Sequence, residues 1–288
     1  MQKVLIVGSG DVARRALPWL IGRYRVFALV RDPASATAWR AAGAIPVLGD
    51  LDCRASLDRL SGLADYVIHL APPPSEGSRD ARSRHLAAVL ARGRSLPRAL
   101  VYVSTTGVYG DCGGAPIDET RPIAPRNARA QRRADAESVW RAFGRHSGVR
   151  VALLRAPGIY AAERLPADRL RAGSPALAPA EDVHTNHIHA DDLARACCAA
   201  LGRGRANRIY NVVDDTDLPM GDFLDRVADA LRLPRPPRVS RAQAEQVLTP
   251  VQMSFLRESR RIGNRRLKAE LGLRLASPTV DSVLRSLP

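Results

Sequence analysis

Lys3-Val4-Leu5-Ile6-Val7-Gly8-Ser9-Gly10-Asp11-Val12-Ala13 is the most informative stretch of this chain. The run 3–7 is short and apolar, as in a buried strand, and a glycine turn follows it directly. An apolar pattern of helical spacing begins at Ala13, and a second short apolar run covers residues 26–30. Strand, glycine turn, helix and strand in this order predict the opening βαβ unit of a dinucleotide-binding fold.

The small residues of this turn have distinct expected roles. Gly8 allows the tight turn, Gly10 lets the backbone approach a pyrophosphate, and Ala13 permits close packing of helix on strand. The helix N-terminus offers free N–H groups to the phosphates. A glycine turn that binds nothing is the alternative, but its place directly after a strand favours a cofactor. The residues that we expect to bind the phosphates are Gly8, Ser9, Gly10, Asp11 and Val12.

Arg31 ends the second strand and bears on the choice of cofactor. NAD sites usually carry Asp or Glu there to hold the ribose 2′-hydroxyl, whereas an arginine suits a 2′-phosphate. The first acidic residue, Asp32, comes one position later. We therefore predict NADP(H), with NAD as the alternative. A solvated loop arginine is the other interpretation of Arg31.

Apolar runs and helical patterns alternate as far as residue 154. This alternation predicts an α/β fold, a doubly wound parallel sheet with helices on both faces. Ligands of such sheets bind beyond the carboxyl ends of the strands. The expected strands after residue 30 are 44–48, 64–70, 99–104 and 149–154, and the clearest helices are 79–92 and 127–146. The strand ends place Gly8, Arg31, Asp50, Ala71, Ser104 and Arg155 at one edge.

The pattern becomes less regular after residue 155. The stretch 156–182 is rich in Ala, Pro and Arg and is expected to form part of a lid. We predict a Rossmann domain over 1–155, completed by 183–215. A smaller, mainly helical substrate lobe is expected from 156–182 and 216–288.

Length and composition favour an ordinary enzyme of the cytoplasm. The chain has 288 residues, of which 45% are hydrophobic, and no apolar run approaches the length of a membrane span. Its N-terminus enters a core strand, unlike a signal peptide. Four cysteines lack metal-ligand spacing, which favours a reducing compartment and no metal site. These cysteines are Cys53, Cys112, Cys197 and Cys198.

The net charge of +15 comes almost entirely from arginine, since Lys3 and Lys268 are the only lysines. A basic surface can attract nucleic acid or anionic metabolites. The arginines are spread along the whole chain and are not interleaved with aromatic residues. A nucleic-acid partner is therefore a minority interpretation, and a small-molecule substrate is favoured.

Further motifs follow the glycine turn in chain order: Gly49-Asp50-Leu51, His69-Leu70-Ala71, Val103–Gly110, Leu154–Tyr160 and Ile188–Ala194. Together they resemble the extended short-chain dehydrogenase/reductases, also called the NAD-dependent epimerase/dehydratase family. Gly49-Asp50-Leu51 is similar to the adenine-contacting segment of that family, and His69-Leu70-Ala71 to its fourth-strand contact. Val103–Gly110 resembles the fifth-strand motif, in which the position of Thr105 carries the catalytic Ser or Thr. Leu154–Tyr160 and Ile188–Ala194 match two later motifs. The resemblance implies cofactor contacts from Asp50, Leu51, Leu70, Ala71, Pro72, Ser104 and Pro157.

One departure from the family pattern concerns catalysis. The family uses Tyr-x-x-x-Lys on the helix after the fifth strand, but here Arg129 and Arg133 occupy those two positions. Arg133 could still hold a ribose, whereas the guanidinium of Arg129 cannot serve as an acid or base. Being four apart, the two share one helix face, which we expect to face the cleft. A solvated arginine-rich face is the alternative. The candidate catalytic residues are Thr105, Arg129 and Arg133.

Other titratable groups are weaker candidates. Tyr109 is expected to be structural, and so is His189, although His184 and His187 lie close to it in sequence. Thr105 could either face a substrate or only bond to backbone. The favoured function is an atypical NADP(H)-dependent oxidoreductase or epimerase acting on a small carbonyl or sugar-nucleotide-like substrate. We expect no metal site, and a homodimer is compatible with the sequence. The alternative is a non-catalytic NADP(H)-binding sensor or scaffold.

Overall fold

The computed structural model describes residues 1–287 and has a seven-stranded parallel sheet at its centre. The strand order is β12-β7-β5-β4-β1-β2-β3. Both the doubly wound α/β fold and the sheet predicted from the alternating pattern are confirmed. The strands are β1 (Lys3–Val7), β2 (Arg25–Val30), β3 (Ile45–Leu48), β4 (Tyr66–His69), β5 (Ala99–Thr105), β7 (Arg150–Ala156) and β12 (Arg208–Asn211).

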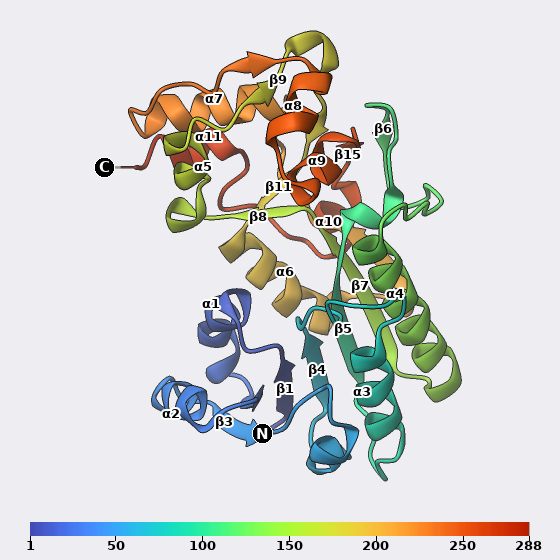
Figure 1. Cartoon of the computed structure of the whole chain (residues 1–288). Helices are drawn as coiled ribbons and strands as arrows, with labels where there is room; N and C mark the ends of the chain where they lie inside the picture. Colours follow the sequence, from blue (N-terminus) through green and yellow to red (C-terminus); the bar gives the residue numbers. More distant parts are fainter. Residues whose placement is uncertain (288) are drawn as a thin grey trace.

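Helices cover both faces of this sheet, as Figure 1 shows. Alternate residues of β1 explain why, since Val4 and Ile6 pack on one face while Leu5 and Val7 pack on the other. The first face carries α1 (Asp11–Ile21), α2 (Pro33–Ala41) and α6 (Ala190–Arg203). The second carries α3 (Ala81–Ala91), α4 (Ala128–Ser147) and the 3₁₀ segment η1 (Arg54–Leu60).

A second body of short elements lies over the carboxyl ends of the strands (Figure 1). Its two apolar clusters form around Phe223 and Leu177, away from the sheet. Its helices are α5 (Ala167–Arg171), α7 (Met220–Ala230), α8 (Arg241–Val247), α9 (Pro250–Leu256) and α11 (Val280–Leu284). The helix α10 (Arg265–Glu270) instead packs on the core of the central sheet through Leu267. Its paired strands are β8 (Gly158–Tyr160) with β11 (His187–His189), β9 (Ala176–Leu177) with β14 (Arg238–Val239), β10 (His184–Thr185) with β13 (Leu218–Pro219), and β6 (Pro116–Ile117) with β15 (Arg261–Ile262).

Candidate active site

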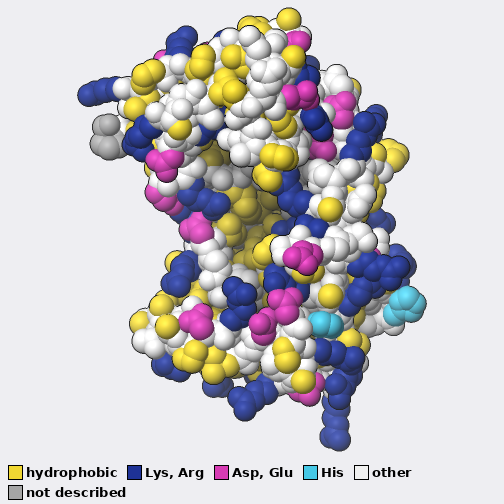
Figure 2. Space-filling view, viewed as in Figure 1, with side chains coloured by type: hydrophobic (Ala, Val, Ile, Leu, Met, Phe, Trp, Pro, Cys, Tyr) yellow, Lys and Arg dark blue, Asp and Glu magenta, His cyan; other side chains and the backbone are white. Residues whose placement is uncertain are grey.

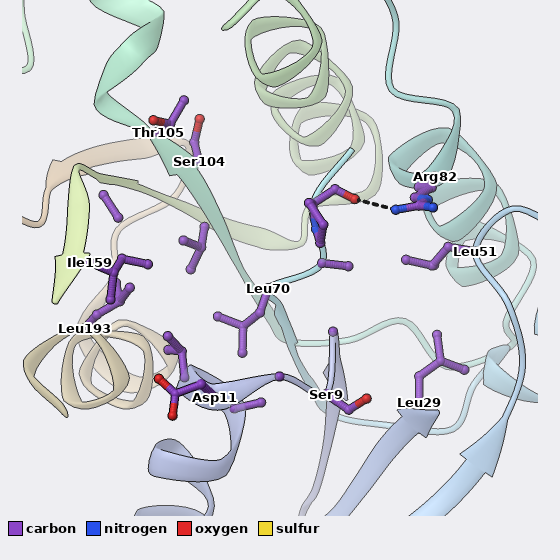
Figure 3. A pocket seen from close by; sticks show the side chains of 18 of the residues that line it. Ser9, Asp11, Leu29, Leu51, Leu70, Arg82, Ser104, Thr105, Ile159 and Leu193 are labelled. Atoms are coloured by element: carbon purple, nitrogen blue, oxygen red, sulfur yellow. Dashed lines mark hydrogen bonds between the residues drawn. The ribbon is translucent and has the colours of Figure 1, made fainter. Parts of the chain in front are cut away.

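A cavity of about 660 Å³ opens at the carboxyl ends of the central strands. The glycine turn after β1 forms one wall, and the segments after β2, β3, β4 and β5 form the others (Figure 3). Every residue predicted to contact the cofactor lines this cavity: Gly8, Ser9, Gly10, Asp11, Val12, Arg31, Asp50, Leu51, Leu70, Ala71, Pro72, Ser104 and Pro157.

The two glycines of the turn differ in what surrounds them. Gly8 has φ +96°, and a Cβ atom there would lie 2.3 Å from the backbone nitrogen of Ala71. Gly8 is therefore required by the close approach of the turn to the end of β4 as well as by its backbone angle. Gly10 caps α1, and a Cβ atom there would meet nothing within 4 Å. No side chain caps this helix, so its first N–H groups and the space beside Gly10 fit a pyrophosphate.

The other end of the cavity carries cationic side chains. Arg31 lines it, whereas the carboxylate of Asp32 caps α2, accepting hydrogen bonds from the backbone N–H and hydroxyl of Ser35 at 2.7 and 2.8 Å. Arg82 of α3 also lines the cavity and makes a two-bond ion pair with Asp52 at 2.7 and 2.6 Å. Sequence patterns did not indicate Arg82, because α3 lies on the face of the sheet opposite α1 and α2, and its packing there is not local in the sequence.

A second cavity, of about 600 Å³, lies between the sheet and the second body. It shares Thr105, Arg133 and Pro157 with the first cavity, so the two meet at the end of β5. Figure 2 shows the molecule hollowed between its two halves, with apolar side chains in the hollow and Lys or Arg side chains around it. The first cavity thus adjoins a separate space that is large enough for a small ligand.

Arg133 and Thr105 stand where the two cavities join. The Nη1 atom of Arg133 donates hydrogen bonds to the Tyr102 hydroxyl and the Val103 carbonyl oxygen, at 3.0 and 2.8 Å. The Thr105 hydroxyl oxygen accepts a hydrogen bond from the backbone N–H of Gly107 at 3.2 Å. Arg129 lines only the second cavity, where its guanidinium carbon lies 4.4 Å from the ring centre of Phe255.

One family model matches most of the length of this chain. The model of the NAD dependent epimerase/dehydratase family matches residues 4–213. The chain belongs to the NAD-dependent epimerase/dehydratase family. The resemblance seen in the motifs is thereby confirmed, together with the NAD(P)-binding fold that it implies.

Two similar proteins match this chain over most of its length. A ketoreductase of Stigmatella aurantiaca that acts on 4-hydroxy-2-methyl-3-oxo-4-farnesyl-3,4-dihydroquinoline-1-oxide is 29% identical over 243 residues, 78% of this chain and 71% of the relative. A functionally unknown conserved protein from Silicibacter pomeroyi DSS is 31% identical, with a TM-score of 0.80, and the match covers 100% of this chain and 98% of that one.

Two further structures share the fold. Human epimerase family protein SDR39U1, solved with NADPH, is 19% identical with a TM-score of 0.75, over 98% of both chains. The dTDP-glucose 4,6-dehydratase DesIV of Streptomyces venezuelae, solved as a double mutant with NAD, is 21% identical with a TM-score of 0.77. That match covers 99% of this chain and 96% of DesIV.

A buried ion pair supports the cofactor edge of this family member. Ser104 donates a 2.6 Å hydrogen bond to Glu137 of α4, and Glu137 accepts two more from Arg155, at 3.0 and 2.7 Å. The side chains of Arg155 and Glu137 are 2% and 3% exposed. Glu137 therefore links Ser104 at the end of β5 to Arg155 at the end of β7, and this buried contact stabilises the two strand ends. Sequence reasoning placed Arg155 at this edge but gave no sign of its partner.

Tyr109 and the histidines have structural partners. The Tyr109 hydroxyl donates to the Asn211 side chain at 2.7 Å, and Nδ1 of His189 accepts from the first turn of α6 at 3.3 Å. His187 stacks on Phe223 with ring centres 4.1 Å apart, and burial lowers the pKa of His187 to about 4. Residues 1–287 contain no group of His, Cys, Asp and Glu side chains arranged to hold a metal ion.

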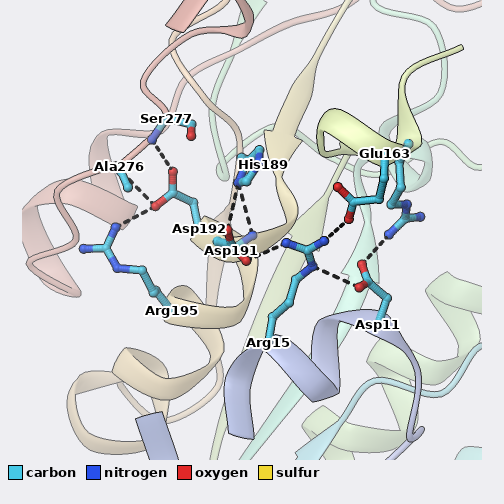
Figure 4. Close-up of polar contacts among 10 residues, drawn as sticks. Asp11, Arg15, Glu163, His189, Asp191, Asp192, Arg195, Ala276 and Ser277 are labelled. Carbon is cyan, nitrogen blue, oxygen red and sulfur yellow. Dashed lines mark hydrogen bonds and ion pairs between the residues drawn. The ribbon is translucent and has the colours of Figure 1, made fainter. Parts of the chain in front are cut away.

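Ion pairs connect the first turn of α1, next to the glycine turn, to neighbouring segments, as Figure 4 shows. Arg15 of α1 pairs with Asp11, with Asp191 of α6, and with Glu163 of the 3₁₀ segment η3 (Ala162–Arg164). Arg164 reaches back to Asp11 at 2.9 Å. These ion pairs connect the stretch 156–182 to the N-terminus of α1.

Within the described part of the chain, no helix combines the length and apolar character needed to cross a membrane.

Proposed function

We propose that this protein is an NADP(H)-dependent oxidoreductase that acts on a small carbonyl compound held in the second cavity. The observation that carries the proposal is the meeting of the two cavities at Thr105 and Arg133. The ketoreductase activity named for the Stigmatella relative supports the reaction type. In this proposal residues 156–182 and 216–288 form the substrate lobe, and residues 1–155 with 183–215 form the cofactor domain.

The first cavity would hold the dinucleotide along its length. The turn at Gly10 would bind the pyrophosphate, and Asp50 and Leu51 would contact the adenosine. Arg31 has no ion pair in residues 1–287, while the nearby carboxylate of Asp32 is used to cap α2. These two facts favour a ribose 2′-phosphate over a free 2′-hydroxyl. The nicotinamide, when bound, supplies or accepts the hydride.

Thr105 and Arg133 would polarise the carbonyl group of the substrate. The Thr105 oxygen already accepts a hydrogen bond, which leaves its O–H free to donate. Nη2 and Nε of Arg133 form no hydrogen bond within the described residues, because both of its bonds use Nη1. Fixed donors of this kind stabilise the negative charge that develops on a carbonyl oxygen during reduction. Because a guanidinium cannot serve as an acid or base, the proton that the carbonyl oxygen takes up on reduction would come from water.

Arg31→Ala is expected to weaken NADPH binding about ten- to hundredfold and to leave NADH binding almost unchanged. A charge-assisted pair of this kind contributes about 1.5–3 kcal/mol, and only NADPH carries the 2′-phosphate. Titration calorimetry with both cofactors measures the difference. Arg40→Ala, which removes an exposed arginine outside the cavity, is the control. Equal losses for NADPH and NADH would show that Arg31 supports the fold rather than the choice of cofactor.

The proposed activity is tested by following NADPH absorbance with a panel of ketones and aldehydes. Arg133→Gln is expected to lower kcat about a hundredfold, as the loss of one fixed donor to a developing oxyanion does, while NADPH binding changes much less. Arg141→Gln, on the same helix but outside both cavities, serves as the control.

A non-catalytic sensor or scaffold is the second candidate, and one observation favours it. Arg129 and Arg133 stand where the family resemblance places the catalytic Tyr and Lys. A natural protein that binds NADPH tightly but consumes none with any carbonyl of the panel would support this second function and overturn the first.

A further inference from the structure

Three arginines on the first two turns of α4 line one wall of the second cavity. They are Arg129, Arg132 and Arg133. Arg132 is buried and donates a 2.7 Å hydrogen bond to the Gly77 carbonyl oxygen, and Arg133 is fixed by the two hydrogen bonds described above. The positive charge of this wall is therefore held in place by the fold.

Acidic side chains balance this charge only in part. Within residues 1–287, none of the three arginines makes an ion pair, and the first turn of α4 has no acidic residue. The nearby carboxylate of Glu258 pairs with Arg260, at 2.9 Å, so it balances another arginine of the cavity lining. Cations at a helix N-terminus oppose the helix dipole, and like charges repel one another. This repulsion lowers the stability of the free protein, and a bound anion would relieve it.

Arg129 is the member of the set best placed to receive a ligand. It forms no hydrogen bond within the described residues, and its guanidinium rests against the ring of Phe255. Arg129 is an exposed residue whose guanidinium is partly desolvated by its surroundings. This desolvation lowers its pKa, Glu258 opposes the shift, and the charges of Arg260, Arg133 and Arg132 add to it. An anion beside Arg129 would relieve that repulsion.

Another part of the cavity wall is apolar. Met220 and Phe223 of α7 and Ile159 and Tyr160 of β8 line it. His187 adds no charge near neutral pH, because burial lowers its pKa to about 4. The cavity thus has a cationic side and an apolar side, which together fit a ligand with an anionic head and an apolar body.

We propose that the second cavity selects substrates that carry a carboxylate or phosphate group, and that Arg129 binds this oxyanion rather than taking part in the chemistry. Arg suits both groups through paired N–H donors. Residues four apart on a helix are separated by about 6 Å along its axis. A substrate bound in this way would present a carbonyl group near Arg133 and Thr105 while its anionic group contacts Arg129. The part concerning the carbonyl rests on the proposed function, and the anion site does not.

The test measures binding of three aromatic probes to the whole protein by calorimetry: benzoate, phenyl phosphate and the neutral benzamide. The wild type is expected to bind at least one of the two anions at least tenfold more tightly than benzamide. Arg129→Gln should weaken anion binding about ten- to hundredfold and leave benzamide unchanged. Tighter binding of benzoate would assign the site to carboxylates, and tighter binding of phenyl phosphate would assign it to phosphates.

Arg126→Gln is the matched control, because Arg126 is exposed, lies three residues before Arg129 and lines neither cavity. This variant should bind the anions like the wild type. Equal losses in both variants would attribute binding to the general positive charge and overturn the proposal, as would equal affinity of the wild type for benzamide and the anions. Calorimetry with NADPH keeps the two proposals apart, because Arg129 does not line the first cavity. If the wild type binds no NADPH or shows no turnover, the proposed function is refuted, whereas the proposed anion site is unaffected.

Discussion

Gly10→Asp is expected to reduce NADP(H) affinity by at least about a hundredfold while the protein stays folded. The new side chain would enter the open space beside Gly10 and place a carboxylate where the helix N-terminus attracts the pyrophosphate. The loss of a charge-assisted contact and the added repulsion together exceed about 3 kcal/mol. The backbone tolerates the change, since φ at Gly10 is −87°. Calorimetry with NADPH and a thermal unfolding curve measure the two effects.

Gly22→Asp is the matched control for this experiment. Gly22 lies at the other end of α1, a Cβ atom there would also meet nothing within 4 Å, and it does not line the cavity. The Gly22→Asp variant should bind NADPH like the wild type. An unchanged affinity in Gly10→Asp would rule out the turn as the pyrophosphate site. A failure of Gly10→Asp to fold would contradict the open space that the structure shows.

Glu137→Gln is expected to lower the free energy of unfolding by about 3–5 kcal/mol. The substitution keeps the shape of the side chain but leaves the guanidinium of Arg155, which is 2% exposed, without its counter-charge. Breaking a buried ion pair on one side costs this much because the remaining charge stays desolvated. Denaturant unfolding followed by circular dichroism measures the change.

An exposed ion pair provides the comparison. Asp58 and Arg92 are 3.3 Å apart, with both side chains 62% exposed. Asp58→Asn should therefore cost about 0–1 kcal/mol. Similar losses for Asp58→Asn and Glu137→Gln would contradict the bracing role that we assign to Arg155 and Glu137.

The first βαβ unit shows why part of the fold could be predicted from the sequence. Its apolar runs and its glycine spacing are local, so the strand, turn and helix follow from residues that are neighbours in the chain. The structure places β1 over the expected 3–7, begins α1 at Asp11, and starts β2 one residue before the expected 26. Parallel strands then bring their carboxyl ends to one edge, which is why residues as far apart as Gly8 and Arg155 are expected together.

The sequence by itself determined the sheet, the set of strand-end residues that lines the first cavity, and the family. The tertiary structure alone decided the partners of the charged side chains: Arg82 with Asp52, Arg155 with Glu137, and Arg260 with Glu258. It also separated the two arginines of α4, because Arg133 lines both cavities and Arg129 only the second. Arginine is frequent throughout this chain, and its local spacing is the same whether it faces solvent, a carboxylate or a cavity. Only the packing of distant segments fixes which of these surrounds each guanidinium, and that environment sets its chemistry.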